Sequence, residues 1–258
     1  MGNSKNIVCI IQARMGSSRL PGKVLMKICG LPMLDWVIKR AGGSRLISKI
    51  VVATTDSPAD DPIDEFCLKS EAACFRGSEF DVLDRYYQTA KSYEAEIVVR
   101  LTADCPLIDP VLIDDCIEKL VSEGADFSAN RLPPPFQRTF PIGLDVEVAT
   151  FKALEIAWKA AKKPFEREHV MPYLYDKDNG FKITLLDSEE NLGSLRWTVD
   201  TADDLVFVQQ VTERLGCRLD FSWKDVLQIL MEHPELSKIN AGIAHKSLND
   251  VDSRADLK

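Results

Sequence analysis

The sequence lacks an excess of positive charge. Its 258 residues include 32 Lys and Arg against 40 Asp and Glu, which gives a formal net charge of -8. Sequence-independent binding to nucleic acid or to an anionic membrane requires clustered positive charge, so we expect neither as a partner. Any local group of basic residues therefore stands out against an acidic background.

Long apolar runs and paired cysteines are missing as well. No run approaches the about 18 apolar residues of a membrane span, and the N-terminal segment has no apolar signal-peptide core. None of the seven cysteines forms a C-x-x-C pair, and several lie in apolar runs. This usage is typical of buried, reduced thiols and argues against a disulfide framework or a zinc site. These absences together predict a cytoplasmic protein.

Short β-branched runs alternate with stretches of helical period through residues 1–125. Such alternation predicts an α/β fold with parallel strands, right-handed crossovers and helices on both faces. The rhythm changes at residue 126 and at the proline-rich segment LPPPFQRTFPIG. We expect residues 1–258 to form one domain, with a lobe at about residues 126–195 inserted on the same sheet. The expected strands are residues 7–13, 50–54, 97–102, 144–148, 182–186 and 196–199.

Several aspartates have ordinary structural interpretations as helix caps. Asp109 followed by Pro110 is typical of a helix start. Thr201 with Asp204 forms a capping-box pattern, and Ser78 with Asp81 predicts a second one that begins a helix over residues 79–92. On that helix, Asp81 and Arg85 are expected to form a surface ion pair.

A cluster of basic residues and glycines follows the first expected strand, in the segment IIQARMGSSRLPGKVL (residues 10–25). Ligands of open α/β sheets bind beyond the carboxyl ends of the strands, so this loop is a candidate phosphate site. It is not a dinucleotide-binding loop, because G-x-G-x-x-G is absent. It is not a P-loop either, because five residues separate Gly16 from Gly22 and Val24 replaces the Ser or Thr.

Three cations remain around this flexible turn, namely Arg14, Arg19 and Lys23. Several cations converging on one short loop suit a triphosphate, because they neutralise its charge as pyrophosphate departs. The competing interpretation is a solvated basic loop without a ligand.

The loop and six further blocks, in order along the chain, resemble one family. The blocks are VVATTD (51–56), FRGSEFDVLDRYY (75–87), RLTADCPLIDP (100–110), FPIGLDVEV (140–148), REHVMPYLY (167–175) and RWTVDTADDL (196–205). Together they resemble the SpsF-type cytidylyltransferases of spore coat polysaccharide biosynthesis, which are similar to the CMP-Kdo and CMP-acylneuraminate synthetases. The resemblance implies a three-layer α/β/α Rossmann-like mixed sheet of the GT-A-like, nucleotide-diphospho-sugar transferase type.

The same resemblance implies an activity. A sugar, expected to be a keto-sugar acid, would be activated as CMP-sugar from CTP with release of pyrophosphate, for surface polysaccharide or glycoconjugate synthesis. The partners would be CTP, a small sugar acceptor and a second copy of the chain in a homodimer. The lobe would bind the acceptor and contribute to dimerisation.

Two aspartates are the candidate ligands of a Mg²⁺ cofactor. Asp104 and Asp200 each follow an expected strand, so their carboxylates can face one ion at the same edge of the sheet. The resemblance implies the same pair. A D-x-D glycosyltransferase motif is incomplete here, because Cys105 and Pro106 follow Asp104.

The remaining candidates are assigned by segment and by resemblance. We expect Arg14, Arg19, Lys23 and Asp104 to be catalytic, and the rest to bind nucleotide or acceptor. In the loop these are Gln12, Ala13, Gly16, Ser17 and Ser18. Near the nucleotide they are Arg76 and Ser78, although Ser78 is equally suited to a cap. Asp145 and Glu147 share one strand face and could bind sugar hydroxyls, while Arg100, Arg167 and Arg196 could bind an acceptor carboxylate.

Two questions stay open at this point. The general base could be His169, or the acceptor hydroxyl could be activated by the metal. The donor could be another nucleoside triphosphate, and a GT-A-type glycosyltransferase or a non-catalytic nucleotide-binding protein would use related architecture.

Overall fold

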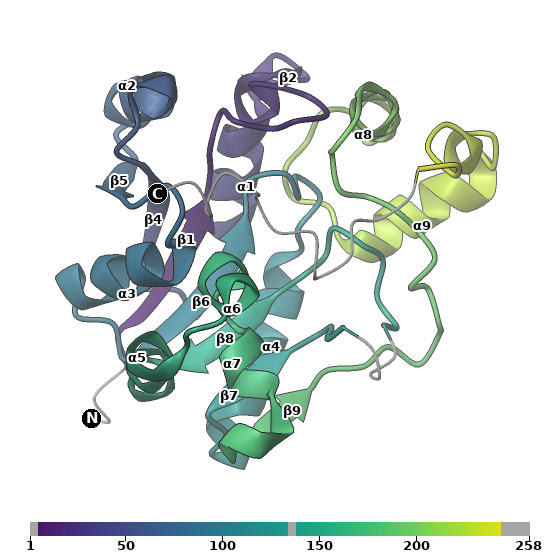
Figure 1. Ribbon diagram of the computed structural model, residues 1–258. Coiled ribbons are helices and arrows are strands. Elements are labelled where there is room, and N and C mark those ends of the chain that lie inside the picture. The colour runs from purple at the N-terminus through teal and green to yellow at the C-terminus, as the bar shows by residue number, and fades with distance from the viewer. Residues whose placement is uncertain (1–4, 134–137, 244–258) are drawn as a thin grey trace.

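The computed structural model describes residues 5–133 and 138–243, so part of the proline-rich segment lies outside the described residues. A mixed seven-stranded sheet runs through the centre in the order β5-β4-β1-β6-β8-β7-β9 (Figure 1). Its strands are β1 (Ile7–Gln12), β4 (Lys49–Thr55), β5 (Ala73–Gly77), β6 (Ile97–Thr102), β7 (Phe127–Ala129), β8 (Glu147–Thr150) and β9 (Ile183–Leu185). Strands β2 (Lys27–Ile28) and β3 (Leu31–Pro32) form a separate hairpin.

The strand directions change after residue 126. Strands β5, β4, β1 and β6 pair in parallel, as the alternation predicts. Strand β8 then pairs antiparallel with both β6 and β7, and β9 pairs in parallel with β7. These three strands therefore continue the same sheet, in which β8 runs opposite to β6 while β7 and β9 run in the direction of β6.

Helices cover both faces of the sheet, which confirms the three-layer α/β/α fold. The alternating side chains of β1 separate two cores: Cys9 and Ile11 pack in one, and Val8 and Ile10 pack in the other. The first core includes side chains of α1 (Met33–Ala41), α2 (Asp61–Lys69), α4 (Pro110–Glu123), α8 (Ala202–Arg214) and α9 (Trp223–Glu232). The second face carries α3 (Val82–Ser92), α5 (Phe151–Ala160), α6 (Pro164–His169) and α7 (Pro172–Tyr175). Short 3₁₀ turns are η1 (Lys23–Leu25), η2 (Pro58–Asp60), η3 (Lys177–Asn179) and η4 (Leu236–Lys238).

The strand expected over residues 196–199 was wrong. This segment makes only an isolated bridge between Arg196 and Ile142. Its backbone bonds go to two different segments, because Trp197 N donates to Ile142 O at 2.7 Å and Val199 N donates to Asp104 O at 2.8 Å. The segment therefore crosses the edge of the sheet without joining its ladder, and it still brings its end beside Asp104.

Two of the three predicted helix starts are confirmed. Asp109 caps α4, and Thr201 with Asp204 forms the capping box of α8. The third was wrong, because α3 begins at Val82 with Asp81 as its cap, while Ser78 Oγ accepts from Asp81 N. The predicted surface ion pair was also wrong, since Arg85 is fully buried and donates to Ser78 O.

The prediction that all cysteines are reduced was wrong for one pair. Cys29, in the turn of the β2–β3 hairpin, forms a disulfide with Cys217, just beyond α8. Their Cα atoms lie 5.8 Å apart, because the hairpin packs on α8, and this separation suits a disulfide. The other five cysteines are free thiols.

Across the described ranges, the helices are all too short or too polar to cross a membrane.

Candidate active site

A cavity of about 1080 Å³ opens at the carboxyl ends of β1 and β6. It is larger than the roughly 300–1,000 Å³ typical of pockets for one small molecule, so it can hold a nucleotide and a second ligand. Most of the predicted site residues line it. They are Gln12, Arg14, Gly16, Ser17, Ser18, Arg19, Lys23, Arg100, Asp104, Asp145, Glu147, His169 and Asp200.

The basic loop has a defined shape, which is fixed at both ends. At its start, Met15 N donates to a carboxylate oxygen of buried Asp60 at 2.6 Å. At its end, Gly22 adopts a left-handed conformation (φ 71°), and its N–H donates to Met15 O at 2.9 Å. Glycine accepts this conformation without strain, so the chain can turn and lead Lys23 into the cavity.

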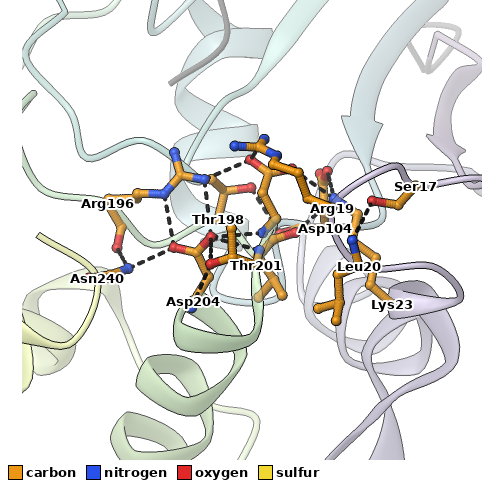
Figure 2. A network of polar contacts seen from close by, with 12 residues as sticks. Ser17, Arg19, Leu20, Lys23, Asp104, Arg196, Thr198, Thr201, Asp204 and Asn240 are labelled. Atoms are coloured by element: carbon orange, nitrogen blue, oxygen red, sulfur yellow. Dashed lines mark hydrogen bonds and ion pairs between the residues drawn. The ribbon is translucent and has the colours of Figure 1, made fainter. Parts of the chain in front are cut away.

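Lys23 lies between the two predicted metal ligands. Its ammonium donates to Asp104 Oδ2 at 2.7 Å, to Asp200 Oδ1 at 2.9 Å and to Val199 O at 2.7 Å. Figure 2 shows this side chain reaching from the loop to Asp104. Burial lowers the pKa of Lys23, but the two carboxylates outweigh that effect and the pKa is raised. Lys23 is therefore a charged, buried ammonium whose donors are all used.

Asp200 is surrounded by three cations, two from the basic loop and one from the segment that carries Asp200 itself. Besides Lys23, Arg19 approaches its Oδ2 at 2.8 Å, and Arg196 donates to the same oxygen at 2.7 Å. Burial alone would raise the pKa of Asp200, but these cations hold it well below its usual range. The carboxylate is thus ionised and oriented at every physiological pH.

Arg196 connects Asp200 to the N-terminus of α8. Its Nε donates to Asp204 Oδ1 at 2.9 Å, and Asn240 donates to the same oxygen at 2.9 Å (Figure 2). Asp204 also accepts from the backbone N–H groups of Asp200 and Thr201, each at 3.0 Å. Asp204, which belongs to the capping box of α8, therefore also positions the segment that carries Asp200.

Replacing Asp204 by Asn is expected to lower the free energy of unfolding at pH 7 by about 1.5–3 kcal/mol, because it removes one of the two carboxylates that the buried Arg196 binds and leaves it only Asp200. Burial raises the pKa of Asp204, but hydrogen bonds from Arg196 and Asn240 lower it overall. Because the pKa of Asp204 is lower in the folded protein than in the unfolded chain, where it is about 3.9, the ionised carboxylate stabilises the fold above that pH. This stability is lost as the pH falls through the pKa of the folded state.

Urea denaturation between pH 7 and pH 3 measures this effect. The difference in the free energy of unfolding between the wild type and Asp204→Asn should shrink below about pH 4. Asp203→Asn, at the exposed neighbouring position, is the control and should change little. A difference that stays constant with pH would contradict the role given to the Asp204 charge.

The far end of the cavity is lined by two arginine–carboxylate groups. Buried Glu147 accepts from Arg100, whose pKa is raised mainly by this carboxylate against the opposing effect of burial. Arg138 binds Asp145 through both of its terminal nitrogens, and Arg131 lies 3.8 Å from the same carboxylate. Each of these three arginines thus has a carboxylate partner, and all three line the cavity.

Five predicted site residues do not line this cavity. Ala13 is buried beside Gln12, and Arg196 is joined to the site through Asp200. Arg167 forms a bidentate ion pair with Asp81 and so joins α6 to α3. Its guanidinium is therefore engaged outside the cavity.

The segment after β5 reaches the site at a different point from the one expected. Arg76 donates to Thr55 O and Ser57 O and pairs with Asp61, while Ser78 takes part in the turn before α3. The next two residues after Ser78, Glu79 and Phe80, line a small recess with Gln12 and Arg14. Arg76 and Ser78 therefore do not line the cavity, and the part of this segment that borders a recess beside Gln12 and Arg14 is Glu79 with Phe80.

The comparisons with known proteins agree with this geometry. The sequence profile of the family described as cytidylyltransferase matches residues 8–219. The chain belongs to this family. It is 31% identical over 237 residues to the spore coat polysaccharide biosynthesis protein SpsF of Bacillus subtilis, covering 89% of this chain and 96% of that protein.

Two further relatives support the assignment. A 3-deoxy-manno-octulosonate cytidylyltransferase of Geobacter sulfurreducens is 39% identical over 120 residues, covering 46% of this chain and 47% of the relative. A solved cytidylyltransferase structure from Leptospira borgpetersenii superposes with a TM-score of 0.85 at 33% identity, covering 93% of this chain and 100% of that one. The chain is a nucleotidyltransferase with the fold that the sequence predicts.

Some residues of this cytidylyltransferase site were missed from the sequence. Asp60, Arg131, Arg138 and Asn240 all hold or line the site. Arg131 directly precedes the proline-rich segment and Arg138 lies within it, and two cations there in an acidic chain were a usable signal. Asp60 and Asn240 carried no comparable signal, because their partners lie far away in the sequence.

Proposed function

We propose that this cytidylyltransferase transfers CMP from CTP to a hydroxyl group of a carboxylated sugar, a keto-sugar acid, and releases pyrophosphate. The observation that carries the proposal is the arrangement of one cavity. Arg14, Arg19 and Lys23 line it together with Asp104 and Asp200, and Arg131 and Arg138 line it as well. The cavity thus has one cationic region for a triphosphate and a second one for an acidic acceptor.

The reaction follows from this order of groups. The acceptor oxygen forms a bond to the α-phosphorus, the bond from that phosphorus to the bridging oxygen breaks, and the electron pair leaves with pyrophosphate. The hydroxyl proton passes to water or to a base such as His169, which lines the cavity. The loop cations stabilise the charge that develops on the leaving pyrophosphate, and fixed cations at that point lower the barrier.

The residues present fit a divalent cation. Asp104, Asp200 and the Val199 carbonyl place three oxygens around one point, which Lys23 Nζ marks. Within residues 5–133 and 138–243 no three metal-binding side chains cluster. Two carboxylates are nevertheless enough, because Mg²⁺ usually takes one or two from the protein and completes its shell with water and substrate phosphates. Mg²⁺ held by Asp104 and Asp200 would neutralise phosphate charge during transfer.

Two observations support a carboxylated acceptor. Arg131 Nε makes no hydrogen bond within the described residues, although it lies 3.8 Å from the Asp145 carboxylate, and both Arg131 and Arg138 line the cavity. Arginine is suited to bind a planar carboxylate through two hydrogen bonds. The Geobacter sulfurreducens relative is named for 3-deoxy-manno-octulosonate, a keto-sugar acid, and the SpsF relative for a coat polysaccharide. The homodimer and the part of the lobe in it stay predictions.

Pyrophosphate release, measured with each nucleoside triphosphate against a panel of keto-sugar acids and neutral sugars, tests the proposal. We expect release with CTP and an acidic sugar. Pyrophosphate release with GTP or UTP in place of CTP would show that the donor is another nucleoside triphosphate. Transfer from a nucleotide-sugar without pyrophosphate would indicate a glycosyltransferase, and binding of nucleotide without turnover would indicate a non-catalytic protein.

Arg131→Gln is expected to raise the KM for the acidic acceptor about tenfold to a hundredfold, because a hydrogen bond to a charged group contributes about 1.5–3 kcal/mol. The KM for CTP should change little, since Arg131 lies away from the basic loop. Steady-state kinetics in both substrates measure the two values. Arg218→Gln, at an exposed site outside the cavity, is the control. Equal effects on both KM values would contradict a role in acceptor binding.

A further inference from the structure

The position of Lys23 disagrees with the role that the basic loop predicts for it. A lysine that stabilises the leaving pyrophosphate must point its ammonium at the phosphates. In the structure all three N–H groups of this ammonium are used, by Asp104, Asp200 and Val199 O, at 2.7–2.9 Å. Lys23 is also only 7% exposed. It cannot bind a phosphate without first leaving the two carboxylates.

We propose that Lys23 is an exchangeable stand-in for the divalent cation. In the metal-free protein its ammonium holds Asp104 and Asp200 together, and it moves to the phosphates when a metal ion takes over the carboxylates. This inference rests on the metal site of the proposed function. It adds a second state of Lys23 and a competition between two cations for the same oxygens.

The need for a stand-in follows from the charges. Two ionised carboxylates that face one point repel each other unless a cation lies between them. Arg19 and Arg196 both contact Oδ2 of Asp200, and neither has a described contact with Asp104. Among the described contacts, Lys23 alone bridges the two aspartates. It therefore keeps the pair assembled before any metal arrives.

The way in which Lys23 is mounted allows the exchange. Its backbone is fixed at the start of η1, just after the left-handed turn at Gly22. The movement therefore falls on a flexible four-carbon side chain with a compact ammonium. The cavity next to it is lined by Ser17, Ser18 and Arg14, where the loop is expected to hold the phosphates. The bound nucleotide thus provides new partners for the displaced ammonium.

A thermodynamic coupling results from this arrangement. In the absence of nucleotide, a metal ion must displace Lys23 while no phosphate offers the ammonium new partners. The apparent affinity for metal is then the intrinsic affinity multiplied by the small fraction of protein in which Lys23 has already moved. Nucleotide phosphates stabilise that displaced state and should raise the affinity for metal. By linkage the metal must raise the affinity for nucleotide by the same factor.

Binding of Mn²⁺ to the full chain without nucleotide, followed by electron paramagnetic resonance, tests the exchange. Lys23→Met is expected to bind Mn²⁺ about tenfold or more tightly than the wild type, because no ammonium has to be displaced. Arg19→Met is the matched control, since it also removes one positive charge beside Asp200, and among the described contacts Arg19 does not bridge Asp200 to Asp104. The gain in Mn²⁺ affinity should be clearly smaller in Arg19→Met than in Lys23→Met. With a saturating, non-reacting CTP analogue, the difference between the wild type and Lys23→Met should narrow.

Three results would overturn the inference or separate it from the proposed function. Mn²⁺ affinity in Lys23→Met that does not exceed that of Arg19→Met would reject the exchange and leave the metal site intact. Mn²⁺ binding that Asp104→Asn leaves unchanged would reject the metal site itself. If Lys23→Met fails to fold, Lys23→Gln keeps a hydrogen-bond donor between the carboxylates and is expected to show the same tighter binding. An unchanged affinity in a folded Lys23→Gln variant would count equally against the exchange.

Discussion

Asp104→Asn is expected to lower kcat/KM for pyrophosphate release by about 10²- to 10³-fold, the range found when one preorganised electrostatic group of an active site is removed. The substitution keeps the shape of the side chain and removes its charge. Asp104 receives the Lys23 ammonium at 2.7 Å and faces Asp200 across it. The loss therefore affects the binding of a divalent cation and the placement of Lys23 at once.

The control for this prediction is Asp56→Asn. Asp56 follows β4 at the same edge of the sheet as Asp104 follows β6, but it is exposed and does not line the cavity. Both variants should keep the circular dichroism spectrum of the wild type, and only Asp104→Asn should lose activity. Wild-type turnover by a folded Asp104→Asn variant would remove Asp104 from the site.

The parts of the fold that depend on local patterns could be predicted from the sequence. The parallel strands come from β-branched runs that alternate with helices, and β6 has the predicted bounds. The caps of α4 and α8 depend on side chains within four residues of each other, so Asp109 and Thr201 identified them. The basic loop was found for the same reason, because Arg14, Arg19 and Lys23 are close in the chain. Its place at the cavity follows from the rule that ligands bind at the carboxyl ends of strands.

Features that depend on distant pairing could not be found in this way. Residues 196–199 have the composition of a strand, but their backbone partners are Ile142 and Asp104. The disulfide joins Cys29 and Cys217, which are 188 residues apart. Arg167 was a reasonable candidate for an acceptor carboxylate until Asp81, 86 residues earlier, proved to be its partner. A charged side chain can be assigned to a ligand only once its protein partners are known.

The basis of the acidic pair was also hidden in the sequence. Asp104 and Asp200 were predicted to meet because each follows a strand, yet Asp200 does not follow one. What brings it to the site is the crossing of residues 196–199 over the segment that contains Gly143. The meeting of the two carboxylates thus depends on how closely two backbones approach each other there.

Gly143→Ala tests this close approach and is expected to lower the free energy of unfolding by about 3 kcal/mol or more, through a steric clash added to backbone strain. Gly143 has a φ of 106°, and a Cβ atom there would lie 2.5 Å from Thr198 N and 2.6 Å from the carbonyl carbon of Trp197. Backbone atoms of a buried segment cannot move aside as a flexible side chain can. The expected fall in Tm is roughly 2–4 °C per kcal/mol for a chain of this size.

The matched control is Gly216→Ala, which separates the clash from the strain. Gly216 also has a positive φ, 69°, but a Cβ atom there would meet no other atom within 4 Å. Gly216→Ala should lower the free energy of unfolding by only about 1–2 kcal/mol, the cost of a left-handed conformation for an ordinary residue. Equal losses of Tm in the two variants would mean that residues 196–199 can shift away from Gly143. If the losses differ as expected, any Gly143→Ala protein that folds should also lose activity, because a shift of Thr198 moves Asp200 away from Asp104 and Lys23.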